Sequence, residues 1–183
     1  LSVGGAVDVV ATARVEDARV DGPVHADRAE LTLSDVHVAA PEGEAVHASS
    51  GARLTLEAVT IRAPSGILVE QSSLTARAVA VRASVDTGLR VGQGATATLT
   101  GVVIEPQRGT AVELACDAGE ERCVEAEDLI VQFPPGLPIA GRGVVVRSGR
   151  VRLRRAYIAR SYEAALAVEG GHVQLEDSTI DAA

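Results

Sequence analysis

The apolar positions of the chain recur in a three-part pattern. Two apolar residues spaced two apart are followed, three residues on, by a second such pair, and after a turn by a third pair. Between Leu54 and Leu114 the pattern passes three times: Leu54, Leu56, Val59, Ile61, Ile67, Val69; Leu74, Ala76, Val79, Val81, Leu89, Val91; and Ala97, Leu99, Val102, Ile104, Val112, Leu114. Each pair predicts a short strand with one inward face. Strands this short bury little alone, so they must stack on their neighbours, which predicts a solenoid.

The same pattern extends along the whole chain. The first apolar residue of each repeat falls at Ala13, Leu31, Leu54, Leu74, Ala97, Val124, Val151 and Val173, at intervals of 18 to 27 residues. A left-handed hexapeptide helix keeps strict multiples of six, whereas a right-handed helix tolerates turns of varying length. Right-handed crossovers are also the rule for parallel strands. We therefore predict an all-β, right-handed parallel β-helix of about eight rungs, with three short strands per rung and a length of about 38 Å.

The whole chain, residues 1–183, is predicted to form one such domain. The alternation of apolar residues is already present at Leu1 and Val3, and it is still present at Ile180. We therefore expect the domain to be a piece of a longer chain, with end caps that are missing or supplied elsewhere, because raw solenoid ends expose core and unpaired strand edges.

Two outward-facing features stand out once the strands are stacked. The two-residue corner Arg154-Arg155 should lie between the acidic corners Glu127-Asp128 and Glu176-Asp177, which predicts ion pairs between rungs on a solvated edge.

The outward residue of the second strand is apolar in four successive rungs, at Ala80, Val103, Ile130 and Tyr157. An apolar stripe on the wet side of a sheet usually marks a contact surface. Another domain, another copy of the chain or a long loop could cover it.

The longest connection in the repeat runs from residue 132 to residue 143 and contains three prolines. A long excursion on a regular scaffold is where function tends to lie, although such a loop also needs apolar anchors of its own. All three aromatic residues fall in this rung and the next, beside several arginines. The candidate ligand or partner residues are Phe133, Leu137, Arg142, Arg152, Tyr157, Arg160 and Tyr162. They would bind a carboxylated sugar or an acidic protein loop by aromatic packing and arginine hydrogen bonds.

Two segments, GILVEQSSLTARAVAV and TGLRVGQGATATLTGVVI, carry a resemblance to a known superfamily. They resemble the repeat of the right-handed parallel β-helix (pectate-lyase-like) superfamily, which includes pectate lyases, polygalacturonases and alginate epimerases. Where that superfamily often stacks an inward asparagine, this chain has Val36, Val59, Val79, Val102 and Leu129. The resemblance implies the fold. It also makes a polysaccharide lyase, glycoside hydrolase or epimerase acting on acidic polysaccharide the alternative function, with Ca²⁺ as a possible cofactor of that alternative only.

The residues themselves give little support to catalysis. Enzymes of that superfamily gather several acidic residues with Arg, Lys or His in one groove, and no such group is evident here. The weak catalytic candidates are Asp128, Arg152 and Arg155. Asp128 and Asp177 lie two rungs apart, about 9–10 Å, with Arg155 between them, which favours a salt-bridge column over an acid–base pair. No metal site is predicted: His25 and His47 should stack about 5 Å apart in adjacent rungs, as an exposed pair.

Composition and charge narrow the function further. The net charge is −8, which argues against nucleic acid as a partner. No apolar run is long enough for a transmembrane helix. Cys116 and Cys123 flank a short polar segment, which favours a disulfide over two unrelated thiols and therefore an oxidising compartment.

We expect a non-catalytic extracytoplasmic module with a structural, adhesive or ligand-binding role and no cofactor. Its expected partner is a polysaccharide or a protein, with self-association through the stripe or the solenoid ends as a further expectation.

Overall fold

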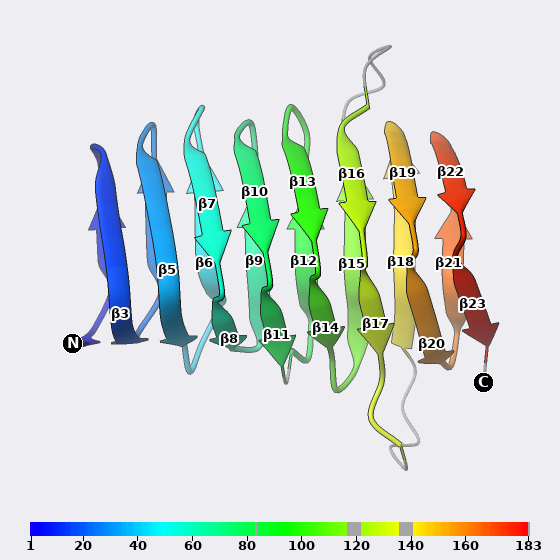
Figure 1. Cartoon of the computed structure of the whole chain (residues 1–183), viewed down its shortest axis with the longest axis horizontal. Helices are drawn as coiled ribbons and strands as arrows, with labels where there is room; N and C mark the ends of the chain where they lie inside the picture. Colours follow the sequence, from blue (N-terminus) through cyan, green and yellow to red (C-terminus); the bar gives the residue numbers. More distant parts are fainter. Residues whose placement is uncertain (83, 117–121, 136–140, 183) are drawn as a thin grey trace.

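A computed structural model describes residues 1–82, 84–116, 122–135 and 141–182. These residues form the right-handed parallel β-helix that the sequence predicts. The described chain contains no helix and makes about seven turns. Figure 1 shows the strands stacked side by side as a flattened rod, with the two termini at opposite ends. Every strand pair is parallel, and the sheets run along the rod.

Three faces make up the rod, and their strands follow the predicted order. The first face consists of the first half of β3 (Ala13–Asp21) and of β5 (Glu30–Ala39), then β7 (Arg53–Glu57), β10 (Ser73–Arg77), β13 (Thr96–Thr100), β16 (Val124–Glu127), β19 (Arg150–Arg154) and β22 (His172–Glu176). The second face consists of β1 (Ser2–Gly4), the second halves of β3 and β5, β8 (Thr60–Arg62), β11 (Ala80–Arg82), β14 (Val103–Glu105), β17 (Ile130–Gln132), β20 (Tyr157–Ser161) and β23 (Thr179–Ala182).

The third face is a sheet of its own. It consists of β2 (Val7–Val9), β4 (Val24–Asp27), β6 (Glu44–Ser49), β9 (Ser65–Val69), β12 (Thr87–Val91), β15 (Gly109–Ala115), β18 (Gly141–Ser148) and β21 (Ala164–Val168). The first and second faces instead belong to one sheet, because β3 and β5 run through the corner without a break.

The register of the stack is the predicted one. Leu54 pairs with Leu31 on one side and with Leu74 on the other. The same row continues through Ala97, Val124 and Val151 to Val173. The inward residues of all three faces form one apolar core of leucine, valine, isoleucine and alanine, in which Leu33, Leu56 and Ile104 are fully buried. A narrow interior filled by aliphatic side chains explains why the chain needs so few aromatic residues.

The corner between the first and second faces turns on one left-handed residue per rung. The second corner residue has a positive φ in every rung, from 47° to 63°: Asp17, Asp35, Ala58, Ala78, Gly101, Asp128, Arg155 and Asp177. Its backbone N–H donates to the carbonyl of the next rung's corner, as from Ala58 to Arg77 and from Ala78 to Thr100, both at 3.0 Å. The residue after it turns inward, so that the side chains at these positions are buried: Val36, Val59, Val79, Val102 and Leu129.

The corner conformation gives a matched pair of stability predictions. A left-handed backbone costs a residue with a Cβ about 1 kcal/mol, and glycine avoids this cost. Gly101→Ala should therefore lower the free energy of unfolding by about 1 kcal/mol, because the space around its missing Cβ is open and the cost is conformational. Ala78→Gly should raise the free energy by about 0.5 kcal/mol, since the gain exceeds the added entropy of the unfolded chain.

Urea unfolding measures both changes, provided that the variants keep the same m-value, the slope of the unfolding free energy against urea concentration. Ala80→Gly, two residues further along in a strand, is the control and should lower stability by about 0.5–1 kcal/mol. Equal losses from Ala78→Gly and Ala80→Gly would show that the corner conformation does not set the cost.

Candidate functional site

The seven predicted contact residues do not converge on one surface. Arg142 lies on β18 of the third face, Arg152 on β19 of the first face, and Tyr157 and Arg160 on β20 of the second face. Tyr162 follows β20 and is 46% exposed, compared with 40% for Tyr157. Leu137 lies outside the described residues. Arg142, Arg152 and Tyr157 are close in sequence, but they lie on three different faces of the rod.

Phe133 is a core residue. Its side chain is 1% exposed and belongs to the continuous apolar cluster. It packs against the backbone of Gly141, where an added Cβ would lie 2.4 Å from the ring. Phe133 thus anchors the chain on both sides of the long connection, the role that the sequence left open for it beside ligand binding. A buried ring cannot offer its face to a ligand on the surface.

Truncation of Phe133 should therefore affect stability. Phe133→Ala leaves a cavity in the core and should cost about 3–5 kcal/mol of unfolding free energy, measured by urea denaturation. Tyr157→Ala is the matched control, because removing an exposed ring should change stability by less than about 0.5 kcal/mol. Equal losses from the two variants would contradict the buried position of Phe133.

The predicted disulfide is confirmed. Cys116 and Cys123 are bonded, with their Cα atoms 6.2 Å apart, and both are buried. Gly149 of the next rung lies against the two sulfur atoms, since a Cβ there would be 2.7 Å from Sγ of Cys123 and 3.0 Å from Sγ of Cys116. Together, the disulfide and this glycine contact fix the start of β16 against β19.

The predicted ion pairs at the first corner are confirmed on one side, where Arg154 and Arg155 pair with the preceding acidic corner. On the other side Glu176 pairs with Arg152, on the strand before the arginine corner. Arg155 donates to both carboxylate oxygens of Asp128 at 2.8 Å and contacts Glu127 at 2.6 Å. Arg152 donates to both carboxylate oxygens of Glu176 at 3.1 and 2.8 Å. Each arginine is therefore held by acidic residues of a neighbouring rung.

These ion pairs shift the pKa values of the weak catalytic candidates away from those that acid or base catalysis needs. The hydrogen bond from Arg155 holds the pKa of Asp128 below its usual range, so this carboxyl stays ionised and is a poor general acid. The hydrogen bonds to Asp128 and Glu127 raise the pKa of Arg155, and the hydrogen bond to Glu176 raises the pKa of Arg152. An arginine base needs a lowered pKa, so both guanidinium groups are tuned in the opposite direction.

A second ion-pair chain, not predicted from the sequence, crosses the third face. Its centre is Glu113, whose side chain is only 9% exposed although it points outward. Glu113 accepts hydrogen bonds from Arg90 at 3.1 Å and from Arg147 at 2.8 Å. From Arg147 the ion pairs continue through Glu169 and Arg142 to Glu163. Residues of four rungs take part, and the stacked outward positions of β12 and β15 were the sequence signal that could have revealed its centre.

This network predicts a pH-dependent loss of stability. Burial acts to raise the pKa of Glu113, but the hydrogen bonds from Arg147 and Arg90 outweigh it and leave the pKa lowered. A lowered folded-state pKa adds stability above the unfolded value, about 4.3, and the contribution disappears as the pH falls through the folded value. Glu113→Gln should lower the free energy of unfolding at pH 7 by about 1–3 kcal/mol.

The deficit of Glu113→Gln should shrink as the pH is lowered from about 5 to about 3, because the wild-type carboxyl is then protonated as well. Urea titrations across this range test it. Glu42→Gln, an exposed residue without an ion pair in the described structure, is the control. A deficit that stays constant with pH would rule out a role for the charge of Glu113.

His25 and His47 lie in adjacent rungs, as predicted, but their rings meet edge to face and His47 is half-buried, whereas the sequence predicted an exposed stacked pair. Their ring centroids are 6.0 Å apart, and the two residues pair in register on the third face. Nδ1 of His25 lies 3.4 Å from Asp8, and Nε2 of His47 lies 3.8 Å from Glu70. Across the described ranges, no cluster of three or more His, Cys, Asp or Glu side chains has the arrangement to hold a metal ion.

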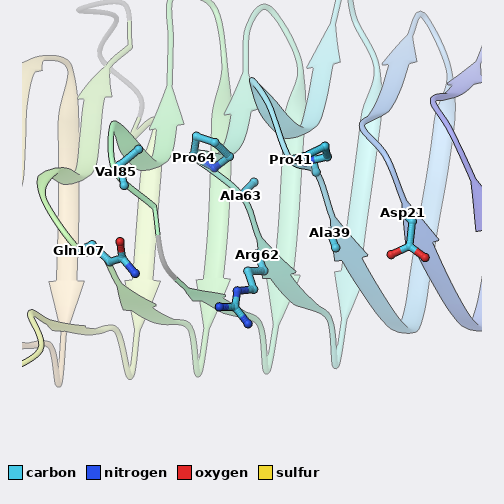
Figure 2. A pocket seen from close by; sticks show the side chains of 9 residues that line it. Asp21, Ala39, Pro41, Arg62, Ala63, Pro64, Val85 and Gln107 are labelled. Atoms are coloured by element: carbon cyan, nitrogen blue, oxygen red, sulfur yellow. The ribbon is translucent and has the colours of Figure 1, made fainter.

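One hollow lies along the edge between the second and third faces, a position that the sequence did not indicate. It has a volume of about 580 Å³ and is lined by Asp21, Ala39, Ala40, Pro41, Arg62, Ala63, Pro64, Val85 and Gln107. Figure 2 shows these residues in one row, with Asp21 at one end, Arg62 midway and Gln107 at the other end. They come from five successive rungs, so the hollow is a groove along the rod, here called the edge groove.

A second hollow continues the edge groove towards the C-terminal rungs. It has a volume of about 330 Å³, shares Gln107 with the first, and is lined also by Arg82, Glu105, Gln132, Phe133, Pro134 and Pro135. The sequence signal for the groove was the repetition of proline just after the second strand, at Pro23, Pro41, Pro64, Pro106 and Pro134. Pro41 and Pro64 of adjacent rungs line the first hollow and Pro134 lines the second, and their rings make these parts of the edge apolar and stiff.

The main chain of the groove is already satisfied. Pro41 and Pro64 have no N–H, and the backbone N–H groups of Ala40, Val85 and Gln107 donate to carbonyls of adjacent rungs at 3.1, 2.8 and 2.7 Å. Asp21 is bonded to Arg19 at 2.8 Å, whereas Arg62 is exposed and has no polar partner in the described residues. A ligand in the groove would therefore meet apolar rings, side-chain amide and carboxylate groups, and one unpaired guanidinium.

The apolar stripe lies where the sequence places it. Ala80, Val103, Ile130 and Tyr157 occupy one row of the second face, paired in register through β11, β14, β17 and β20. Ile130 is 37% exposed and Tyr157 is 40% exposed, while Ala80 and Val103 are half-buried by their neighbours. The stripe is therefore open to solvent at its C-terminal half.

Comparisons with family models, with curated proteins and with solved structures gave no significant match. The part of the chain that the structure describes has no helix long and apolar enough to cross a membrane. The functional argument therefore rests on the geometry of the rod itself.

Proposed function

We propose that this chain is a non-catalytic, extracytoplasmic β-helix module that binds an unbranched polysaccharide along its edge groove. The observation that carries the proposal is the groove itself, which takes its lining from five successive rungs and so presents a continuous track parallel to the rod. The disulfide supports an oxidising compartment. We include in the proposal that the chain belongs to the pectate-lyase-like superfamily, because its fold agrees with that membership.

The chemistry of the groove favours a sugar chain over an extended peptide. A peptide that adds to a sheet edge gains most of its affinity from main-chain hydrogen bonds, and the corner N–H groups here are already used or replaced by proline. Sugar rings instead pack their C–H faces on flat apolar groups and hydrogen-bond through hydroxyls to side chains such as Gln107 and Asp21. The groove supplies both kinds of contact.

The enzymatic alternative has less support in the geometry. Its three candidates, Asp128, Arg152 and Arg155, lie at or near the first corner, on a different edge from the groove. Their carboxylate and guanidinium groups are paired, and the resulting pKa shifts oppose acid or base catalysis. The binding of a polysaccharide without cleavage is therefore the function that the site supports best.

Calorimetric titration with galacturonate oligomers and cello-oligosaccharides tests the proposal. At least one of these chains should bind the wild type, and Ala39→Trp should weaken that binding about 10-fold or more, because the ring would fill the groove from an outward strand position. Thr55→Trp, at an outward position of the first face, is the control and should bind as the wild type does.

Two outcomes would count against the proposal. Ala39→Trp could bind as tightly as Thr55→Trp, which would place the ligand elsewhere. The oligomers could be cleaved, with unsaturated or shortened products, which would restore the enzymatic alternative.

A further inference from the structure

The second face carries two parallel rows of outward residues. One row is the apolar stripe. The other lies two residues further along each strand and runs through Asp21, Ala39, Arg62, Arg82 and Glu105, then through Gln132, Ala159 and Asp181. Of these residues Ala159 is buried and adds nothing to the exposed surface of the row. Within this second row Arg82 and Glu105 pair with each other at 3.2 Å. Arg62 and Asp181 are exposed and have no polar partner among the described residues.

The two rows are self-complementary under a two-fold rotation. Consider an axis that lies in the plane of the face, parallel to the strands, midway between β14 and β17. The rotation places β14 opposite β17 of a second copy, β11 opposite β20, and β8 opposite β23. Because the axis follows the strand direction, the stripe meets the stripe and the second row meets the second row.

The residues that this rotation brings together match in size and charge. The smallest stripe residue, Ala80, faces the largest, Tyr157, and Val103 faces Ile130. In the second row Arg62 faces Asp181, so the two unpaired charges of opposite sign meet in both halves of the interface. Glu105 faces Gln132, whose amide can donate to the carboxylate. No like charges are placed opposite each other in these rows.

We infer that two copies of this chain pair antiparallel through their second faces, across β8, β11, β14, β17, β20 and β23, which Figure 1 shows side by side. The overlap covers six rungs, about 29 Å at the strand spacing. This narrow strip is smaller than the roughly 800 Å² per partner of a standard stable interface. The dimer is therefore weak and concentration-dependent. The inference does not need the proposed function, but it uses residues of the edge groove, because Arg62 lines the first hollow and Arg82 lines the second. A ligand in the groove and a second copy of the chain would therefore compete.

Sedimentation velocity over a range of protein concentrations tests the pairing. The wild type should show a reversible monomer–dimer equilibrium. Arg62→Asp and Asp181→Arg should each weaken dimerisation about 10-fold or more, because each places like charges opposite one another twice. The double variant Arg62→Asp/Asp181→Arg should restore it. Arg77→Asp, at the first corner, is the control and should leave the equilibrium unchanged.

Cysteine cross-linking tests the register. Both native cysteines are in the disulfide. A mixture of Ala80→Cys and Tyr157→Cys chains should cross-link under mild oxidation, because the two positions face each other. Neither variant alone should cross-link. In the dimer, a given position of one copy lies three rungs, about 14 Å, from the same position of the other copy, which is beyond the reach of a disulfide. Circular dichroism of each variant checks that the rod is folded.

The inference fails if the wild type remains a monomer at the highest attainable concentration, or if the double charge variant dimerises no better than the single variants. Cross-linking of Ala80→Cys with itself, equal to that of the mixture, would also overturn it, because that result requires a different register or a different face.

Discussion

The structure depends on the stacking of each rung on the next. A strand of three to five residues, such as β8 or β11, has too little apolar surface to be stable alone, and its backbone groups find partners only in adjacent rungs. The left-handed corner residue makes this stacking continuous, because its N–H donates across the rung boundary while the following residue turns into the core. Any residue that disturbs the corner therefore disturbs hydrogen bonding and packing together.

Stacking also decides what the charged residues do. Side chains at the same position of successive rungs lie about 4.8 Å apart, so opposite charges at equivalent positions become ion pairs and like charges repel. The arginines of the C-terminal rungs are nearly all placed beside acidic residues, as Arg155 is with Asp128 and Arg147 with Glu113. This arrangement neutralises groups that, in isolation, resemble a basic binding patch.

The flat, repetitive surface of a β-helix offers two kinds of binding site. A groove forms where the corner residues of several rungs are small or cyclic, as Ala63 and Pro64 are, and it favours a ligand with a repeat of its own. A broad contact forms where a row of outward residues is apolar, as from Ala80 to Tyr157, and it favours another flat face. The edge groove and the second face share residues such as Ala39 and Arg62, so a ligand in the groove and a second copy on the face compete for the same surface.

The sequence by itself determined the rungs, the register, the corners and the rows of outward residues. All of these follow from the period-two alternation of apolar residues, which fixes which side of a strand is buried, and from the equal spacing of strands, which then aligns Leu54 with Leu74 or Ile130 with Tyr157. The column around Arg155 followed from the same alignment, whereas the disulfide followed from the short spacing of Cys116 and Cys123.

Only the tertiary structure decided what lies between the strands. Phe133 is buried although it begins an extended connection, Glu113 is covered although it points outward, and the edge groove opens beside Pro41 and Pro64. Connections between strands have no fixed period, so the direction of their side chains depends on local backbone conformation and on the neighbouring rung, about 18 to 27 residues away in sequence. Proximity in sequence therefore grouped Arg142, Arg152 and Tyr157 into one site, whereas the turns of the rod distribute them over three faces.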